Sequence, residues 1–415
     1  TTQKIVLDRK EIENLSVMTV GEVLGKLPGI ELGSMSGGGA QRARGMSRDS
    51  VQILVDGERL AGGGAMVAGV IGRLPSGDLE RVEILRGSSA EFGGAAPVTV
   101  NLIMKKALPK SSTEVRGGLG RRGTESYNQL SWKKNGGEGG FSWSFPISLM
   151  WNNSPVLLTA YRQDATAGTR TLWQQENERG ATKLGHHAIT PRMTWKEGSD
   201  SLTIAPIFLF GPQDSNSDTA LTDYLTPAAG GTRASRQNSL MRVKRIRAEG
   251  EKHLGASKLT GRASINSVKN AIDVVRDTFD INNVLINTSN DHTDNRDSEF
   301  NFAVRLDKPI GEHLLAVGVE HINLRRTQDQ SFTGSFASYL SQERQSIAWV
   351  QDDWSVQSNT TFTYGLRGES VALSSAGSSG QRSRLLPSVA VRWEPKDKWV
   401  MRSSLGAGLK MPKLD

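Results

Sequence analysis

Cysteine is absent from the 415-residue chain, and so are long apolar runs. The lack of cysteine suits an oxidising compartment, where stray thiols are a liability. Without an apolar run of about 18 residues, the chain cannot form a transmembrane helix. No signal peptide is visible, so we expect the chain to be mature or trimmed. Only 36% of the residues are apolar and the mean hydropathy is −0.40, values that a hydropathy scan would not associate with a membrane.

The net charge of +8 is distributed unevenly. The first 107 residues hold 13 Lys and Arg against 12 Asp and Glu, which leaves 38 against 31 for the remainder. A basic excess could attract nucleic acid, lipopolysaccharide or anionic ligands. The charges are mixed in sign and form no basic cluster on one predicted helix, so we interpret them as a solvated surface and expect no nucleic-acid binding.

Motifs for enzymatic chemistry are missing. The glycine runs Gly37–Gly39 and Gly62–Gly64 are not followed by Lys-Ser/Thr and match no phosphate loop. Gly33–Gly37 lacks the spacing of a nucleophile elbow. His186 and His187 could bind a metal or haem, but adjacent histidines point in different directions on a strand and no carboxylate pattern accompanies them. We therefore expect no enzyme, no catalytic residues, no resident metal and no cofactor.

The first hundred residues contain two helix starts. Thr19 and Glu22 have the spacing of a capping box, in which each side chain bonds the backbone amide of the other residue. Asp8 and Glu11 repeat this spacing. Apolar residues follow both boxes, and a Pro-Gly pair ends the second pattern at residue 29. We expect two short helices.

Strand signals follow these helices. Asp56-Gly57 interrupts the apolar run Val51–Leu60, and this pair is a strong hairpin signal because a type I′ turn needs positive φ at both central positions. Further along, Asp78–Lys106 joins two β-rich runs through a tight, glycine-rich connector. Helices and strands together predict a small α/β domain.

The Asp78–Lys106 segment resembles the closing segment of the plug domain of TonB-dependent outer-membrane transporters. The matching residues are Glu80, Arg81, Glu83, Arg86, Gly87, Phe92, Gly93, Asn101 and Lys105. Ser88 and Pro97 depart from the family pattern, which usually has proline and glycine there. The Arg44-Gly45 pair, the Asp-Gly hairpin and the helix ending in Leu-Pro-Gly are also similar to the family, so the resemblance covers Lys4–Lys106.

The chain after Pro109 is organised as recurring candidate strands of about 8–15 residues. We expect about thirteen of them, near 113–120, 125–134, 140–151, 189–195, 201–210, 236–251, 258–273, 295–306, 313–326, 343–355, 360–374, 384–393 and 399–411. Short turns alternate with longer polar segments at 152–188, 211–235, 274–294 and 325–342, which we predict to be loops. Short periplasmic turns and long extracellular loops are typical of a transmembrane barrel.

Side-chain alternation supports this interpretation near the C-terminus. Leu385, Val389 and Trp393 share one face of a predicted strand, whereas Arg392 and Glu394 lie on the other. A water-soluble sheet with one buried face would show the same alternation in any single strand. The sorted connections and the plug-like segment ahead of them favour the membrane. The runs 351–354, 364–367, 386–388 and 406–412 also resemble the family.

The predicted fold class is therefore an antiparallel membrane β-barrel, partial and with about 13 strands present, that follows an N-terminal α/β plug domain. We place the plug domain at residues 1–107, a linker at 108–112 and the partial transmembrane barrel at 113–415. Barrels of this family have about 22 strands, so the resemblance implies that about nine C-terminal strands are missing. No TonB box is visible before Thr1.

The resemblance also implies a function, which is TonB-dependent active import of a scarce, large solute across the bacterial outer membrane. A ferric siderophore ranks first. Expected partners are the inner-membrane TonB complex, outer-membrane lipid and lipopolysaccharide, and a ferric-siderophore-type ligand, and we expect a monomer. Arg81, Glu83 and Arg86 are expected to pair with charges on the barrel wall. Ligand is expected at the plug apices, at Arg42, Arg44, Met46, Arg48, Gly62, Gly63, Gly64 and Met66.

Three other functions stay open at this point. Import of cobalamin, haem or oligosaccharide would use the same architecture. A receptor that senses a ligand without transporting it is a second class, which an extra periplasmic domain before Thr1 would favour. A passive porin is a third class, for which a plug would serve no purpose.

Overall fold

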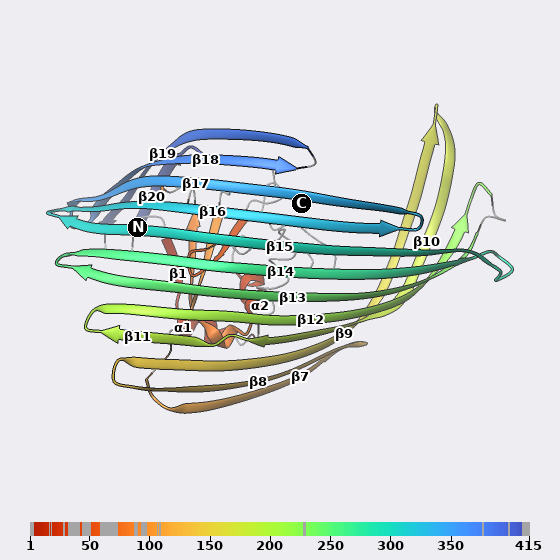
Figure 1. Cartoon of the computed structure of the whole chain (residues 1–415), viewed down its shortest axis with the longest axis horizontal. Coiled ribbons are helices and arrows are strands. Elements are labelled where there is room, and N and C mark those ends of the chain that lie inside the picture. The colour runs from red at the N-terminus through yellow and green to blue at the C-terminus, as the bar shows by residue number, and fades with distance from the viewer. Residues whose placement is uncertain are drawn as a thin grey trace.

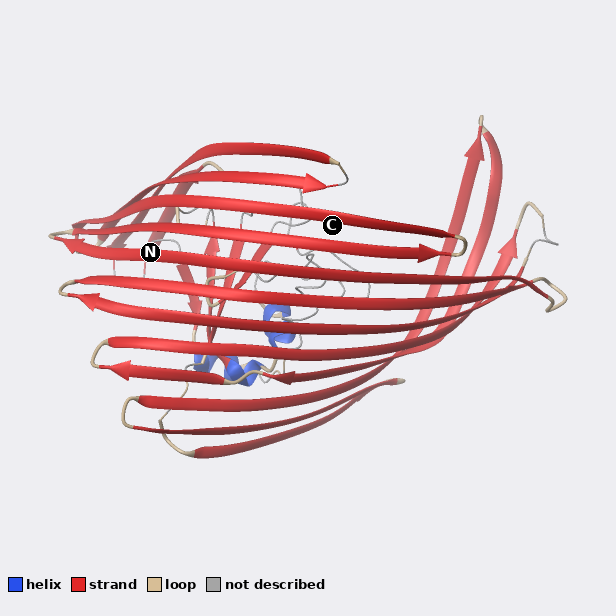
Figure 2. Cartoon of the chain, viewed as in Figure 1, coloured by secondary structure: helices blue, strands red, loops and turns tan. Residues whose placement is uncertain are grey.

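The computed structural model describes residues 4–15, 17, 19–27, 30–31, 42–43, 51–58, 74–86, 90–92, 98–105, 107, 109–226, 230–375, 377–396 and 399–408. A small N-terminal unit lies behind a long, curved sheet in the view of Figure 1. The sheet is built of strands alone, whereas the helices belong to the N-terminal unit (Figure 2). No helix in the described part of the chain is long and apolar enough to cross a membrane.

The N-terminal unit is built on a four-stranded sheet in the order β1-β5-β6-β4. The first three strands pair antiparallel, and β4 pairs parallel with β6. Its elements are β1 (Lys4–Leu7), α1 (Arg9–Asn14), α2 (Val20–Gly25), β2 (Ile30–Glu31), β3 (Arg42–Ala43), β4 (Val51–Val55), the 3-10 helix η1 (Ser76–Asp78), β5 (Leu79–Arg86) and β6 (Val98–Met104).

Both short helices begin with the predicted capping boxes. Asp8 accepts a hydrogen bond from the Glu11 amide, and Glu11 accepts one from the Asp8 amide, each at 2.8 Å. Thr19 and Glu22 make the same reciprocal pair at 3.3 Å. Each box satisfies two of the N–H groups that a helix start leaves without partners, which helps such short helices to form.

One hydrophobic core fills the N-terminal unit, between the two helices and the sheet. Six of its side chains are fully buried: Val20, Val23, Leu79, Val82, Val100 and Leu102. Burying a valine or leucine side chain contributes about 1.5–3 kcal/mol relative to leaving it exposed. The unit therefore has a core of its own, separate from the large sheet.

The large sheet is antiparallel, and its strands pair in sequence order from β7 to β20. Its elements are β7 (Ser112–Arg122), β8 (Glu125–Glu138), β9 (Phe141–Thr166), β10 (Thr169–Ile189), β11 (Arg192–Glu197), β12 (Asp200–Asp223), β13 (Gly231–Leu254), β14 (Ser257–Phe279), β15 (Leu285–Ile310), β16 (His313–Phe332), β17 (Ser335–Gln357), β18 (Thr360–Ser375), β19 (Ser378–Lys396) and β20 (Trp399–Gly406).

Strand β11 continues β10 after a break at Thr190 and Pro191. Both elements pair with the same two neighbours, β9 and β12. Proline has no N–H to donate to a sheet, which explains an interruption at this point. The sheet of 14 elements therefore has thirteen strand positions, in agreement with the predicted number of about thirteen.

The prediction of long polar loops was wrong, because most of each predicted loop is strand. For example, β9 and β10 meet in a two-residue turn at Ala167 and Gly168, whose φ angles are +51° and +81°. This hairpin rises away from the other strands in Figure 1. A strand that meets water on both faces has no alternation of apolar and polar side chains. Only its backbone hydrogen bonds to the neighbouring strands define it, and these bonds leave no pattern in the sequence.

Aromatic pairs mark two levels on the face of the sheet that points away from the N-terminal unit, here called the outward face. Phe141 and Trp195 lie 5.0 Å apart beside the short turns. Ten residues further along β9, the rings of Trp151 and His187 are in contact, with their centroids 5.5 Å apart. The ring of His187 also stacks on that of Phe210, with a centroid distance of 6.1 Å. Ten residues span roughly 33 Å of strand, or about 25 Å of height at the usual tilt. This is the height of the apolar band of a membrane barrel.

We expect residues 1–107 to fold as an isolated, soluble domain, because the core lies entirely within them. Leu102→Ala should then lower the free energy of unfolding by about 2–5 kcal/mol, since it leaves a cavity in that core. Urea denaturation followed by circular dichroism measures the change. As a control, Val6→Ala changes a side chain that is 44% exposed and should cost less than about 0.5 kcal/mol. An unfolded fragment, or one that inserts into micelles as a barrel, would contradict the proposed division.

Candidate functional site

A tight turn after β4 carries the candidate site. Asp56 and Gly57 have φ angles of +51° and +81°, as the predicted type I′ turn requires. The turn is fixed to β6 by three hydrogen bonds. The Met104 amide donates to the Asp56 side chain at 2.9 Å, the Gly57 amide to the Asn101 side chain at 2.8 Å, and the Asp56 amide to the Leu102 carbonyl at 2.8 Å. Glycine suits position 57 for a second reason, since a Cβ there would lie 2.9 Å from the guanidinium of Arg262.

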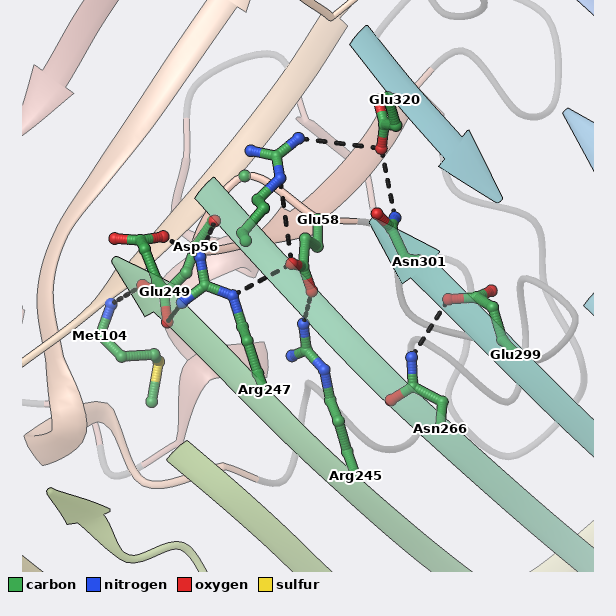
Figure 3. A network of polar contacts seen from close by, with 12 residues as sticks. Asp56, Glu58, Met104, Arg245, Arg247, Glu249, Asn266, Glu299, Asn301 and Glu320 are labelled. Atoms are coloured by element: carbon green, nitrogen blue, oxygen red, sulfur yellow. Dashed lines mark hydrogen bonds and ion pairs between the residues drawn. The ribbon is translucent and has the colours of Figure 1, made fainter. Parts of the chain in front are cut away.

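Glu58 follows the turn, and its side chain is 1% exposed. Arg245 forms a short hydrogen-bonded ion pair with it. The Nε atom of Arg247 lies 3.2 Å and that of Arg262 lies 3.9 Å from the carboxylate. Figure 3 shows Arg245 and Arg247 reaching Glu58 from the same strand. Three cations from the large sheet therefore surround one buried anion of the N-terminal unit.

Asp56 makes a second set of contacts with the large sheet. Arg192, at the start of β11, lies 3.0 Å from its carboxylate. Arg247 lies 3.8 Å from the same carboxylate and donates a hydrogen bond of 2.9 Å to the Asp56 carbonyl. We call these six residues the plug–barrel ion cluster: Asp56, Glu58, Arg192, Arg245, Arg247 and Arg262.

The strand period places the arginines of this cluster on one side of the sheet. Residues 245 and 247 are two apart on β13, so both point to the same face, which is the face toward the N-terminal unit. Arg245 and Arg247 are 2% and 3% exposed. The polar network continues across the neighbouring strands, through Asn266 to Glu299 at 3.1 Å and Asn301 to Glu320 at 3.2 Å (Figure 3).

Burial and charge act in opposite directions on the two carboxyl groups. Burial alone would raise the pKa of Glu58, but Arg245, Arg247 and Arg262 outweigh it and hold that pKa below the ordinary value of 4.5. Burial would likewise raise the pKa of Asp56, whereas Arg192 and Arg247 lower it below 3.8. Both groups are therefore ionised at neutral pH, and the cluster holds two anions among four cations.

A second contact region joins the segment around Glu91 to β15 and β18. Glu91 lies 2.6 Å from Arg305. Arg367 donates hydrogen bonds to the carbonyl groups of Ala90 and Glu91, at 2.9 and 2.8 Å. Gly365 permits this approach, because a Cβ there would lie 2.6 Å from the Cβ of Ala90. Elsewhere, Lys133 of β8 pairs with Asp78 at 3.2 Å.

The predicted network of Arg81, Glu83 and Arg86 differs from these contacts. Arg81 and Glu83 do share a face, and they form an ion pair of 2.7 Å. The other partners of Glu83 are Lys4 at 2.6 Å and Asn101 at 3.2 Å. All three partners belong to the N-terminal unit, so Glu83 connects β1, β5 and β6. We expected it to pair with charges on the barrel wall, and the structure shows that its partners lie within the plug. Arg86 is exposed at the end of β5, and its pairing with the wall stays a prediction.

Most of the predicted ligand-contacting apex cannot be placed. Arg42 belongs to β3, which pairs with β2. Seven other predicted residues lie outside the described part of the chain: Arg44, Met46, Arg48, Gly62, Gly63, Gly64 and Met66. The apex therefore stays a prediction.

The adjacent histidines of β10 point to opposite faces, as expected for a strand. His186 is buried, with 1% exposure, and His187 packs on the outward face against Trp151 and Phe210. Among the residues that the structure describes, no three His, Cys, Asp or Glu side chains gather as a metal site would need.

Sequence reasoning found Asp56 only as a turn residue, and it did not single out Glu58 or the four arginines. One signal was available in the sequence. Arg245 and Arg247 alternate with apolar residues on a predicted strand, so one face of that strand had to bury two cations or expose them to a lumen. Which carboxylates would meet them depends on contacts 187 residues apart, which no local pattern contains.

Two family models match the chain. The model of the TonB-dependent Receptor Plug Domain matches residues 1–100, and that of the TonB dependent receptor-like beta-barrel matches residues 115–415. The vitamin B12 transporter BtuB of Vibrio vulnificus is 30% identical over 138 residues, which are 32% of this chain and 22% of that protein. BtuB of Vibrio cholerae is 33% identical over 132 residues, or 30% of this chain and 21% of that protein.

Solved structures share the fold at low identity. FpvA of P. aeruginosa, in complex with a heterologous pyoverdine and iron, has a TM-score of 0.67 and 13% identity, covering 97% of this chain and 56% of FpvA. The copper transporter OprC has a TM-score of 0.66 and 13% identity, covering all of this chain and 63% of OprC. The chain thus spans about a fifth of the curated relatives and 56–63% of these solved chains.

Glu58→Gln should destabilise the attachment of the N-terminal unit, because it leaves the buried Arg245 and Arg247 and the partly buried Arg262 with less compensating negative charge. We expect the free energy of unfolding to fall by about 3–5 kcal/mol. The change is measured as a lower thermal midpoint of the full-length protein in detergent. Glu312→Gln, in an exposed turn, is the control for loss of one negative charge and should have little effect. In a double-mutant cycle, Glu58→Gln with Arg245→Gln should cost less than the sum of the two single changes. Equal melting of wild type and Glu58→Gln would refute the role of the cluster.

The lowered pKa values also predict the direction of a pH dependence. A carboxyl group whose pKa is lower in the folded protein than in the unfolded chain stabilises the fold at pH values above its ordinary pKa. This contribution disappears as the pH falls through the lowered pKa. Stability contributed by the cluster should therefore be constant from pH 8 to about 5 and decline below about 4.5, where unfolded Glu and Asp bind protons. Thermal melting across this range measures it. A difference between wild type and Glu58→Gln that grows as the pH falls would contradict the assignment.

Proposed function

The chain belongs to the TonB-dependent receptor family of the bacterial outer membrane, and from this we propose that the complete protein imports a scarce, large solute with energy supplied through TonB. The N-terminal unit is then the plug, and the large sheet is part of the barrel wall. We propose a transporter and not an enzyme. We also propose that it works as a monomer surrounded by outer-membrane lipid and lipopolysaccharide.

The observation that carries this proposal is the plug–barrel ion cluster. Glu58, Arg245 and Arg247 are at most 4% exposed, so moving the plug would leave Glu58 and Arg245 without these partners, whereas Arg247 would keep Glu249 of its own strand. Such a gate stays closed without external work. A passive porin needs no gate of this kind, so the cluster supports an energy-dependent transporter over a pore.

The plug also offers a place where force from the periplasm could act. β1 lies at the edge of the plug sheet, and it holds to β5 through four paired residues and the Lys4–Glu83 ion pair. Force on the N-terminus would reach this edge strand first. Since Glu83 also contacts Asn101, and Asn101 holds the Gly57 amide, a continuous chain of contacts connects β1 to the turn that carries the cluster.

A ferric siderophore is the substrate class that we propose first. Iron chelates exceed the size that general porins pass and are too dilute for diffusion to supply, which are the conditions under which active import is needed. The FpvA structure shows this fold around a pyoverdine and iron, although its 13% identity supports only the architecture.

Cobalamin is the second candidate, and a specific observation favours it. The curated relatives named above are vitamin B12 transporters, with 30–33% identity over about a third of the chain. Selection between the two substrates would be made by loops and apex residues of the complete protein. Both candidates are large chelates that would need the same gate.

Uptake by cells that carry the complete gene should require TonB. We expect radiolabelled ferric siderophore to accumulate in cells with TonB and only to bind at the surface in cells without it. Labelled cyanocobalamin, tested in parallel, decides between the two substrates.

Two outcomes would count against import. Equal accumulation with and without TonB would indicate a pore, and tight binding with no accumulation in either strain would indicate a sensing receptor. Where Glu58→Gln is assayed for uptake, Glu312→Gln is the matched control for the lost negative charge. Glu312 lies in an exposed turn, so this variant should import at the wild-type rate.

A further inference from the structure

Six basic side chains lie on the outward face of five neighbouring strands, at one level of the sheet. Each is 10 to 14 residues from the end of its strand that adjoins one of the two-residue turns at 255–256, 311–312 and 358–359, which lie at the same end of the sheet. Five are exposed, and the side chain of Lys269 is 41% exposed. We call this set the outer basic patch: Arg242 and Lys244 of β13, Lys269 of β14, Arg296 of β15, Arg325 of β16 and Arg344 of β17.

The strand register brings like charges side by side. Arg242 is the direct partner of Lys269 across β13 and β14, and Lys269 is the direct partner of Arg296 across β14 and β15. Like charges in directly opposite positions of an antiparallel pair are destabilising. Three cations in one row therefore need anions nearby.

The protein supplies only part of the negative charge that this row needs. Asp294 pairs with Lys269 at 3.2 Å and with Arg296 at 2.6 Å, and Asp329 reaches only to 4.0 Å from Arg296. Within the described part of the chain, no ion pair joins a carboxylate to the other four members, Arg242, Lys244, Arg325 and Arg344. The patch keeps an excess of positive charge.

The position of the patch relative to the apolar band indicates where the missing anions come from. Ile246 of β13, Phe300 of β15 and Val319 of β16 are exposed on the same outward face, between the patch and the short turns. These two-residue turns lie at one end of the sheet, and the connections between β12 and β13 and between β14 and β15, at the opposite end, are longer. In an outer-membrane barrel the short turns are periplasmic and the longer connections are extracellular. The patch therefore lies just beyond the apolar band on the extracellular side, at the level of the lipid headgroups of the outer leaflet.

We propose that the outer basic patch binds the phosphate groups of lipopolysaccharide. These groups are anionic, and they lie at the height where the apolar band ends. Arginine and lysine are the side chains that bind phosphate most strongly. This inference deepens the proposed lipid contact, and it depends on the membrane setting and not on import.

The test is binding of lipid A to the purified full-length protein in detergent. Arg242→Gln/Lys269→Gln/Arg296→Gln should bind bisphosphorylated lipid A at least about tenfold more weakly than wild type, since each basic residue near an anionic surface contributes measurably to affinity. Wild-type affinity should fall as salt is added. The control Lys252→Gln/Lys258→Gln/Lys308→Gln removes the same charge from the short-turn end and should keep wild-type affinity.

Two further probes identify the chemistry. Dephosphorylated lipid A should bind wild type and the triple variant equally weakly, and millimolar inorganic phosphate should not displace lipid A. Arg242→Lys/Arg296→Lys keeps the charge and should bind within about twofold of wild type. If the triple variant does not fold, Arg325→Gln and Arg344→Gln, which remove cations without an ion-pair partner, should each weaken binding by a few-fold.

Several outcomes would overturn the inference. Equal affinity of the triple variant and its control would do so, as would equal binding of both forms of lipid A to wild type. Displacement by inorganic phosphate would indicate a site for free phosphate instead. Because the readout is lipid binding, a protein that binds lipid A through the patch but imports nothing would sustain this inference and refute the proposed import.

Discussion

The burial of unlike charges between plug and wall is the interaction on which this structure depends. On the inner face of the sheet, Glu58, Arg245 and Arg247 are almost completely removed from water, and Arg262 beside them is 20% exposed, so the buried charges need one another. A buried ion pair adds little net stability compared with apolar packing, but losing one partner is costly. Such an interaction suits a gate, because departure of the plug would take Glu58 away from Arg245, which has no other carboxylate partner among the described residues.

The type I′ turn explains how one short segment can present two carboxylates to the wall. Positive φ at Asp56 and Gly57 reverses the chain sharply, so that residues 56 and 58 both reach arginines of the wall. Hydrogen bonds to Met104 and Asn101 hold the turn on the plug sheet. The rigidity of the plug core is thereby transmitted to the cluster.

The features that could be predicted from the sequence are those that depend on residues close together in the chain. Helix caps at Asp8 and Thr19, the Asp-Gly turn and the strands of the apolar band all follow from patterns within a few residues, and the structure confirms them. The extensions of β9 and β10 were missed because a strand solvated on both faces has no period of two. The partners of Glu58 were missed because they depend on how a turn near residue 57 meets β13 and β14, and no local pattern fixes that meeting.

Strand β13 shows why register is so strictly determined in this fold. Arg245 and Arg247 face the plug, Ile246 faces the lipid, and Lys244 and Arg242 face the headgroup level. A slip of one residue would turn the two buried arginines toward the apolar band and Ile246 toward the cluster. Because successive side chains of a strand point to opposite faces, a slip of one residue would remove the contacts of both faces at the same time. The same alternation that lets one strand pair with the plug on its inner side and expose Ile246 and the cations on its outer side therefore allows it only one register.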